Sequence, residues 1–256
     1  MRFQIVRSKI YIIFTTLAAL LLLVLPGCNT NSTTPISTTS VTATTPVSTS
    51  TSTSTFSGNS PVPGEVETAE FLGTALTPIS QQRNNALSGT KHIDKNTYVL
   101  TVDGLVDNPL KLTYDDLLAL PQISKLMPLN CVEGWGFTAK WTGPSLKDIC
   151  EMAKVQSGAN IAIFYTVDDP GGYSSLDLNY INERNIILGM KLNDITLPDE
   201  RGFPFQVVAE SKYGYKWSKW ITRIELSDNT SFRGYWEGYG YNNNADVGGP
   251  AFESSP

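Results

Sequence analysis

One cysteine is the residue best placed to do chemistry in this chain. Cys131 lies in the segment Asn130-Cys131-Val132-Glu133-Gly134-Trp135-Gly136, which follows a strand-like stretch and places a thiol on a loop beside a candidate pocket. A thiolate is a soft ligand that selects transition metals over magnesium or calcium. Cysteine counting alone favours another interpretation, a disulfide between Cys131 and Cys150, which suits two leftover cysteines of an exported domain.

Several common sites are excluded by the sequence. No Gly-x-Gly-x-x-Gly follows a strand, and neither a Walker loop nor a Cys-x-x-Cys pair occurs. The single histidine, His92, argues against zinc sites that need several imidazoles and against a Ser-His-Asp triad. Because its neighbours are polar, we predict that His92 is a solvated surface residue.

The charge balance argues against a nucleic-acid partner. The 256 residues include 41% apolar and 17% charged residues, a globular composition. Beyond residue 27 there are 16 basic against 24 acidic residues, a balance of -8, with no long basic run. Neutralising phosphates requires clustered Lys and Arg, so we expect no nucleic-acid binding.

The start of the chain is predicted to direct export. Three basic residues precede an apolar run over residues 10–25, which ends in Leu25-Pro26-Gly27-Cys28. This box resembles the processing site of bacterial lipoproteins, which makes residues 1–27 a signal peptide and Cys28 the lipidation site. The alternative is an uncleaved anchor helix. Either way, we expect the body to be anchored to the cell membrane on its extracytoplasmic face, at the cell surface or in the periplasm.

A Ser/Thr-rich segment separates this anchor from the folded part. Between residues 30 and 57, 20 of 28 residues are Ser or Thr and none is charged. Such a composition cannot bury a core, so residues 28–60 are predicted to form a disordered linker behind the lipidated cysteine. The functional domain is then 61–256.

Within this domain, strands outnumber helices. Period-2 apolar patterns rich in β-branched and aromatic residues predict strands over residues 98–102, 159–166, 205–209 and 220–226. Helices are predicted over 114–120, capped by Thr113 with Asp116 in a capping box, and over 145–153, with a third after Asn179. We therefore predict an α+β class, a β-dominated mixed fold.

The segment around Cys131 resembles the metal-ligand segment of the sulfite oxidase family of molybdopterin-binding oxidoreductases. Further matches follow in the family's order from about residue 71 to residue 252. They are Arg83-Asn84-Asn85, Trp141-Thr142-Gly143-Pro144-Ser145-Leu146, Phe164-Tyr165-Thr166, Gly202-Phe203-Pro204-Phe205, the segment from Tyr213 to Trp220, and Gly234-Tyr235-Trp236. The resemblance implies the molybdopterin-binding fold of that family.

The resemblance also implies a molybdenum-molybdopterin cofactor and a set of contacts. Cys131 would be the protein ligand to molybdenum and the catalytic residue, because the family uses one cysteine thiolate beside the two sulfurs of the pterin dithiolene. A separate set of residues would hold the pterin and its phosphate: Asn84, Asn85, Thr166, Arg201, Gln206, Lys216, Ser218 and Lys219. Trp135, Tyr239 and Tyr241 are predicted to wall a substrate pocket, with Trp141 as a further candidate.

One departure from the family affects the expected substrate. Animal and plant sulfite oxidases carry arginines just after the metal cysteine, whereas this chain has Val132-Glu133-Gly134-Trp135. The segment is more similar to the bacterial branch that contains the periplasmic protein-methionine-sulfoxide reductase catalytic subunit, in which a neutral sulfoxide suits the pocket. We expect oxygen-atom transfer on a small sulfur compound or sulfoxide. Electrons would be exchanged with a separate partner, a quinone-linked membrane protein or a cytochrome. The alternative function is a cofactor-free lipoprotein binding module with the same fold.

Overall fold

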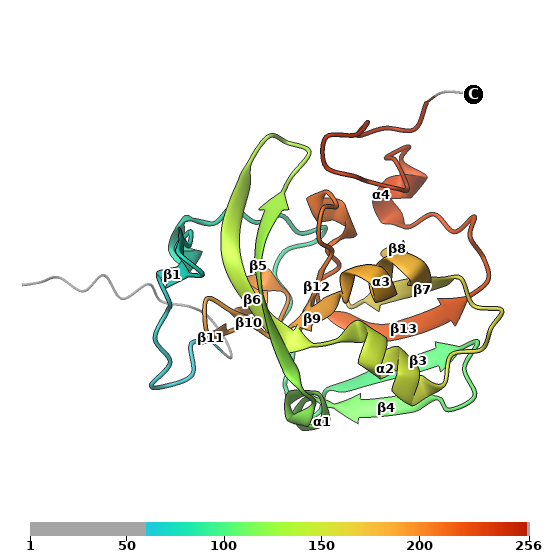
Figure 1. Ribbon diagram of the computed structural model, residues 1–256, viewed down its shortest axis with the longest axis horizontal. Helices are drawn as coiled ribbons and strands as arrows, with labels where there is room; N and C mark the ends of the chain where they lie inside the picture. The colour runs from blue at the N-terminus through green and yellow to red at the C-terminus, as the bar shows by residue number, and fades with distance from the viewer. Residues whose placement is uncertain (1–59, 255–256) are drawn as a thin grey trace, which may run out of the picture. The chain divides into compact units, whose positions relative to one another are not determined.

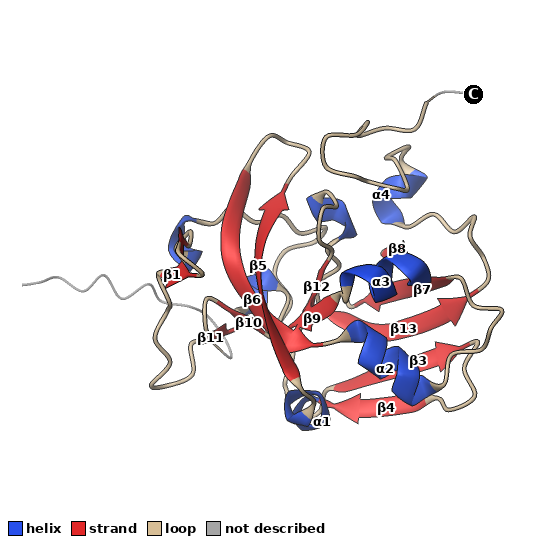
Figure 2. Ribbon diagram, in the orientation of Figure 1, coloured by secondary structure: helices blue, strands red, loops and turns tan. Residues whose placement is uncertain are grey.

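The computed structural model describes residues 60–254, whose secondary structure is mostly strand (Figures 1 and 2). The strands are β1 Glu70–Phe71, β2 Thr74–Ala75, β3 Val99–Gly104, β4 Leu110–Thr113, β5 Gln122–Asn130, β6 Gly136–Pro144, β7 Ile161–Thr166, β8 Ser174–Asp177, β9 Ile187–Gly189, β10 Lys191–Leu192, β11 Ile195–Thr196, β12 Gln206–Val208 and β13 Ile221–Ser227. The helices are α1 Tyr114–Ala119, α2 Leu146–Ala153, α3 Leu178–Arg184 and α4 Tyr235–Gly238, with short 3-10 helices η1 Ile79–Gln81, η2 Asp199–Arg201 and η3 Gly214–Lys216.

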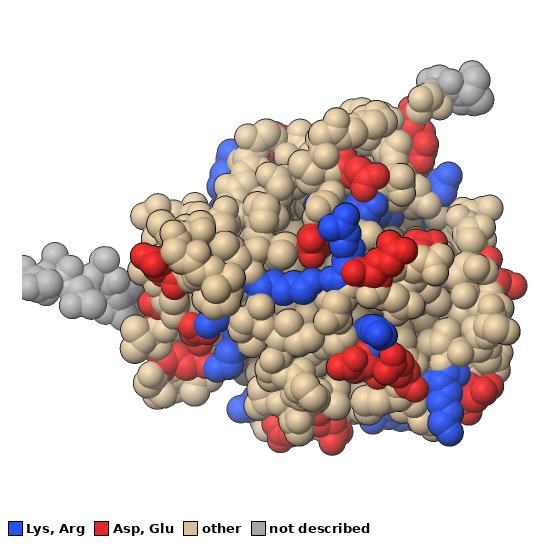
Figure 3. Space-filling view, in the orientation of Figure 1, with Lys and Arg blue, Asp and Glu red and all other residues tan. Residues whose placement is uncertain are grey.

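The predicted signal peptide, the Cys28 lipidation site and almost all of the predicted linker lie outside the described residues. Within residues 60–254, no helix has both the length and the apolar character that crossing a membrane requires. Acidic and basic side chains lie interspersed on the face that Figure 3 shows.

The largest sheet has five strands in the order β4-β3-β13-β7-β8. Its centre contains three of the strands expected from period-2 patterns, β3, β13 and β7. Strand β3 runs parallel to β13, although Thr101 and its partner Arg223 lie 122 positions apart in the sequence. Their inward side chains, such as Leu100, Val102, Phe164 and Ile224, are fully buried. Burial of this apolar face stabilises the sheet.

A long hairpin of β5 and β6 carries the candidate metal ligand. The two strands pair from Gln122 opposite Pro144 up to Asn130 opposite Gly136, so the intervening loop begins with Cys131. Within that loop the Cys131 N–H donates to the Trp135 carbonyl oxygen at 2.8 Å. Gly134 has a φ of 82°, which an L side chain rarely adopts, and this permits the tight turn. The hairpin thus holds the thiol at its tip.

The helices agree with the sequence signals. The predicted capping box forms at α1, where the Thr113 hydroxyl accepts from the Asp116 N–H and the Asp116 carboxylate accepts from the Thr113 N–H. Cys150 lies buried in α2 as a small apolar residue, and both Cys131 and Cys150 are free thiols. The disulfide alternative is therefore wrong, whereas the β-dominated α+β fold class is confirmed.

Candidate active site

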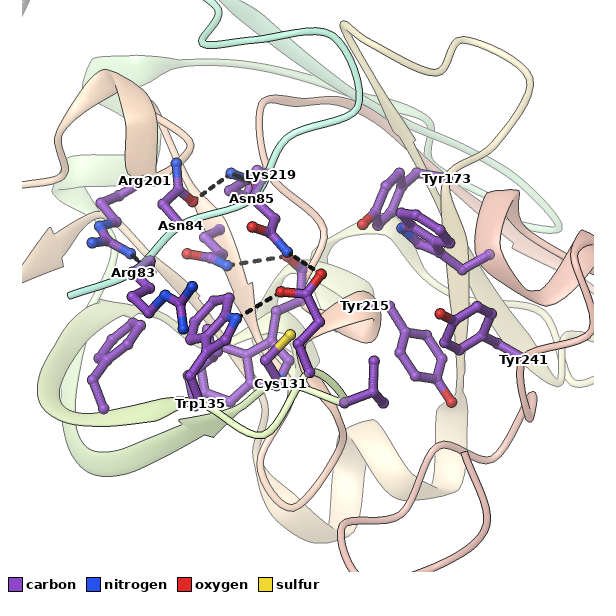
Figure 4. A pocket seen from close by; sticks show the side chains of 18 residues that line it. Arg83, Asn84, Asn85, Cys131, Trp135, Tyr173, Arg201, Tyr215, Lys219 and Tyr241 are labelled. Carbon is purple, nitrogen blue, oxygen red and sulfur yellow. Dashed lines mark hydrogen bonds between the residues drawn. The ribbon is translucent and has the colours of Figure 1, made fainter. Parts of the chain in front are cut away.

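Cys131 lines a pocket that brings together segments far apart in the sequence. The hollow is open to solvent at its mouth. Figure 4 shows Arg83, Asn84, Asn85, Arg201 and Lys219 on one side of Cys131, and Tyr173, Tyr215 and Tyr241 on the other. The pocket therefore has a cationic and amide half and an aromatic half.

The thiol of Cys131 is half-buried at the junction of these halves. Burial raises its pKa, and the nearby Glu133 carboxylate adds to the rise, while the backbone N–H groups of Glu133 and Val132 and the Arg83 guanidinium oppose it. The thiol is therefore protonated at neutral pH in the free protein. A metal that binds here must displace this proton.

Glu133 is fixed beside the thiol by two neutral donors. Its carboxylate accepts from Trp135 Nε1 at 2.8 Å and from Asn85 Nδ2 at 3.0 Å. The Trp135 bond, followed by that from Asn85, lowers the pKa of Glu133. The carboxylate is exposed and ionised at neutral pH, so it presents negative charge at the pocket.

The short helix η2 organises the cationic half. Arg201 donates to the carbonyl oxygens of Gln82 and Arg83, and the Glu200 carbonyl accepts from Asn84 Nδ2 and Lys219 Nζ. Gly202 follows with a φ of 103°, and a Cβ built there would lie 2.7 Å from Lys219 Cβ, so a glycine is needed for this close approach. The turn thereby seats both cations in the pocket wall.

These cations lack charged partners within the described residues. Arg83, Arg201 and Lys219 form no salt bridge there, and Arg201 Nε is buried without a hydrogen-bond partner. Burial lowers the pKa of Arg201 to about 10. Burial and the adjacent Arg201 charge together lower the pKa of Lys219 to about 7. A wall of this kind favours an anionic group.

The aromatic half depends on contacts made by the segment that precedes α4. A Cβ on Gly234 would lie 2.2 Å from the Tyr173 carbonyl oxygen, which accepts the Tyr235 N–H at 2.9 Å. This contact places Trp236 against Tyr173, whose hydroxyl receives a side-chain hydrogen bond from Trp236. Burial raises the pKa of Tyr173, so its hydroxyl stays protonated. Both rings line the pocket.

Most of the predicted site residues meet in this hollow. Its lining includes Cys131 and seven others: Asn84, Asn85, Trp135, Arg201, Gln206, Lys219 and Tyr241. Gln206 is buried and its side-chain amide donates to the Trp217 carbonyl oxygen at 3.1 Å. The structure therefore gathers residues from both flanks of the Gly-x-Pro turn around one thiol.

Four predicted site residues do not line the hollow: Thr166, Lys216, Ser218 and Tyr239. Lys216 Nζ lies instead in a buried ion pair with Glu237 Oε1 at 2.5 Å, and Thr166 donates to Asp168 Oδ1 at 2.7 Å. Ser218 is buried without a hydrogen-bond partner for its hydroxyl among the described residues, while Tyr239 is 70% exposed. Their predicted contacts with cofactor or substrate stay predictions.

Two other expectations have clear structural outcomes. Trp141 is fully buried between Phe137 and Trp217 in the core, so it is not a pocket wall. His92 is exposed, as predicted, and its Nδ1 also lies 2.6 Å from the buried Asp199 carboxylate, a pairing that the sequence does not reveal.

Several residues that line the pocket were not expected from the sequence. Tyr215 and Trp217 belong to the loop segment recognised in the sequence, and Trp236 belongs to the recognised aromatic segment, so their proximity could have been expected. Tyr173 follows Gly171-Gly172 and carries no comparable signal. Its place depends on the contact with Gly234, which only the tertiary structure shows.

The model of the oxidoreductase molybdopterin-binding domain family matches residues 87–236 of the chain. The chain belongs to this family. It is a molybdopterin oxidoreductase domain of the sulfite oxidase type, and the resemblance found in the sequence is confirmed.

Two individual relatives also match part of the chain. A protein of Azospira oryzae provisionally named as a protein-methionine-sulfoxide reductase subunit is 32% identical over 152 residues, which cover 59% of this chain and 57% of the relative. The protein-methionine-sulfoxide reductase catalytic subunit MsrP of Campylobacter jejuni is 25% identical over 175 residues, covering 62% of this chain and 59% of that protein.

Among solved structures, the sulfane dehydrogenase SoxCD from Paracoccus pantotrophus is similar with a TM-score of 0.54 and 22% identity, over 57% of this chain and 42% of that one. This likeness shows the fold. The chain spans less than two thirds of the length of each of these three proteins.

The residues present fit the cofactor that the family implies. Cys131 offers one thiol, and no group of three metal-binding side chains gathers within the described part of the chain, so most ligands to a metal here would come from the cofactor. Arg201 Nε has no hydrogen-bond partner and Lys219 has only neutral ones within the described residues, so both suit a phosphate-bearing group. The pocket therefore matches a thiolate ligand on one side and an anionic cofactor on the other.

Proposed function

We propose that this chain is an extracytoplasmic, molybdopterin-dependent oxidoreductase that transfers an oxygen atom on a small sulfur compound or sulfoxide. The observation that carries this proposal is the position of the Cys131 thiol between the cationic and aromatic halves of one pocket (Figure 4). When bound, molybdenum-molybdopterin supplies a metal that exchanges an oxygen atom and two electrons with the substrate.

Each half of the pocket has a distinct task under this proposal. Cys131 would supply its thiolate to the metal, and Arg201 and Lys219 would hold the anionic part of the cofactor. Asn84 positions Lys219, since its Oδ1 accepts from Lys219 Nζ at 2.8 Å. The aromatic half receives the substrate and excludes water. Exclusion of water keeps the electrostatic interactions of the site strong.

The reaction balances in either direction. A sulfoxide plus two electrons and two protons gives a sulfide and water, whereas sulfite plus water gives sulfate with release of two electrons and two protons. Since Glu133 stands at the thiol with a lowered pKa, a neutral sulfoxide suits this site better than an anion. The electrons come from a separate carrier, a quinone-linked membrane protein or a cytochrome.

A metal and pterin analysis tests the function. The full chain, produced in a host that makes molybdopterin, is expected to contain about one molybdenum atom per chain and to reduce dimethyl sulfoxide with reduced viologen as the electron donor. The Cys131→Ala chain is expected to lose activity even where pterin is retained, and Cys150→Ala is the matched control. A wild-type chain free of both metal and pterin would instead favour a binding module.

The location is a separate proposal with its own test. The lipoprotein-like box Leu25-Pro26-Gly27-Cys28 supports lipidation at Cys28, with the body held at the outer face of the membrane. Cell fractionation is expected to find the wild-type chain with membranes. Lipidation is refuted if the wild-type and Cys28→Ala chains are processed alike and their N-terminal masses differ by no more than the substitution itself.

A further inference from the structure

Aromatic rings continue from the pocket wall to the surface of the protein. Tyr215 and Tyr241 line the pocket with ring centroids 5.2 Å apart, and Tyr241 meets Phe252 at 4.6 Å. Phe252 is 57% exposed. The three rings therefore form a continuous apolar path from the neighbourhood of Cys131 to solvent.

The backbone holds these rings in place. Residues 240–242 lie antiparallel to residues 251–253, with the Asn242 N–H donating to the Ala251 carbonyl and the Glu253 N–H donating to the Gly240 carbonyl, both at 2.9 Å. The Tyr215 hydroxyl also donates to the Asn242 carbonyl at 2.8 Å. A ligand would therefore meet an ordered surface, which lowers the entropic cost of binding.

This aromatic path is connected to the support of the thiol. Tyr213 forms a parallel bridge with Asn130, the residue before Cys131, and its N–H donates to the Ala245 carbonyl at 2.8 Å. The segment that contains Tyr241 and Phe252 is thus fixed relative to the tip of the β5–β6 hairpin. It follows that the distance between thiol and aromatic path is set by hydrogen-bonded structure.

Tyr241 and Phe252 lie beyond the part of the chain that matches the family model, which ends at residue 236. Tyr241 contributes to the pocket wall from this C-terminal segment. Glu133 supplies negative charge at the thiol, whereas Glu253, which follows Phe252, is paired with Arg233 at 4.0 Å. Negative charge and the negative faces of aromatic rings disfavour anions.

We propose that Tyr241 and Phe252 determine substrate specificity, and that they select an uncharged sulfoxide bearing a planar apolar group. This inference rests on the proposed function. The sulfoxide oxygen would face the Cys131 side of the pocket, and the apolar group would lie along Tyr241 toward Phe252. The reaction consumes one sulfoxide, two electrons from a reduced donor and two protons, and it yields one sulfide and one water.

Two substrates of different size test the inference. The full cofactor-loaded chain is assayed with methyl phenyl sulfoxide and with dimethyl sulfoxide, using reduced viologen as the electron donor. Loss of the ring in Tyr241→Ala is expected to raise the KM for methyl phenyl sulfoxide about tenfold, a larger increase than in the KM for dimethyl sulfoxide. Phe252→Ala is expected to raise the same KM about threefold.

Two control variants test whether the changes in KM depend on the aromatic rings of Tyr241 and Phe252. Leu118→Ala removes another exposed apolar side chain, from α1, and is expected to change neither KM. Phe252→Leu keeps an apolar side chain without a ring, so it is expected to resemble Phe252→Ala if the ring matters. Equal KM changes for both sulfoxides, or no change in Tyr241→Ala and Phe252→Ala, would overturn the inference.

A binding measurement separates this inference from the proposed function. Quenching of tryptophan fluorescence reports binding of methyl phenyl sulfoxide to the full chain without turnover. Weaker binding in Tyr241→Ala and Phe252→Ala supports the inference even if no sulfoxide is reduced, an outcome that would refute only the proposed function. Unaltered binding in both variants refutes the specificity role.

Discussion

Lys219 Nζ donates to Asn84 Oδ1 at 2.8 Å, which joins two residues 135 positions apart at the wall of the pocket. The same ammonium also donates to the carbonyl oxygens of Asn85 and Glu200. Three neutral acceptors solvate this charge without a carboxylate. Because burial and the adjacent Arg201 dominate, the pKa of Lys219 falls to about 7.

The depressed pKa predicts a pH dependence of stability in the cofactor-free chain. An unfolded lysine has a pKa of about 10.4, so between pH 7 and pH 10 the unfolded state binds the additional proton. Stability should therefore rise with pH in this window, by up to ~1.4 kcal/mol per pH unit from this group. Urea unfolding at several pH values measures the slope.

The Lys219→Met chain provides the comparison. Between pH 7 and pH 10, unfolding of this variant is expected to take up nearly one proton fewer than unfolding of the wild type, so its free energy of unfolding should rise less steeply with pH. Lys147→Met, at an exposed position on α2, should keep the wild-type slope. Equal slopes in wild type and Lys219→Met would contradict the assigned pKa. A bound anionic group should raise the pKa of Lys219 and remove the effect.

Local sequence signals predicted much of the fold. The period-2 patterns located β3, β7, β12 and β13, and Thr113 with Asp116 located the start of α1, because these elements depend on nearby residues. The parallel pairing of β3 with β13 could not be predicted from local signals, because it joins residues that lie 122 positions apart in the sequence. Long-range pairing leaves no local period in the sequence.

The candidate site shows the same division. Cys131, Arg201 and Lys219 lie in recognisable motifs and do meet in one pocket. Lys216 lies in the same motif as Lys219, but its side chain pairs with the buried Glu237. The motif alone could not distinguish the two lysines, because the direction of each side chain depends on partners from distant parts of the chain.

The buried pair of Lys216 and Glu237 leads to a prediction about stability. Glu237 Oε1 also accepts from the Ser174 hydroxyl at 2.6 Å, and both charged residues are almost fully buried. Removing one charge leaves the other uncompensated, so Glu237→Gln should lower the free energy of unfolding by about 3 kcal/mol. Urea unfolding at pH 7 measures this loss.

A double variant and a surface pair complete that test. Lys216→Met combined with Glu237→Gln should regain much of the lost stability, because no unpaired charge remains. The exposed pair of Lys147 and Glu151, 3.7 Å apart on α2, should contribute less than about 1 kcal/mol when broken. A Glu237→Gln chain as stable as wild type would contradict the ion pair.

The two thiols of the described domain should differ in reactivity. Cys131 is partly exposed in the pocket, whereas Cys150 is buried in α2, where burial raises its pKa to about 12. Iodoacetamide should therefore modify Cys131 in the folded, metal-free chain and reach Cys150 only in urea. Peptide mass spectrometry identifies the modified site. Equal modification of both thiols without urea would contradict the burial of Cys150.

Glu133 should control the reactivity of the neighbouring thiol. Its carboxylate is one of the causes that raise the pKa of Cys131, so Glu133→Gln should lower that pKa and increase the thiolate fraction at pH 8. We expect iodoacetamide to modify Cys131 of the metal-free Glu133→Gln chain about two to five times faster than wild type. Glu183→Gln, which removes an exposed carboxylate from α3, should leave the rate unchanged.

The loss of negative charge in Glu133→Gln should also lower the KM of the cofactor-loaded chain for sulfite relative to that for dimethyl sulfoxide. An unchanged modification rate together with an unchanged KM ratio would show that Glu133 has no electrostatic influence on the site.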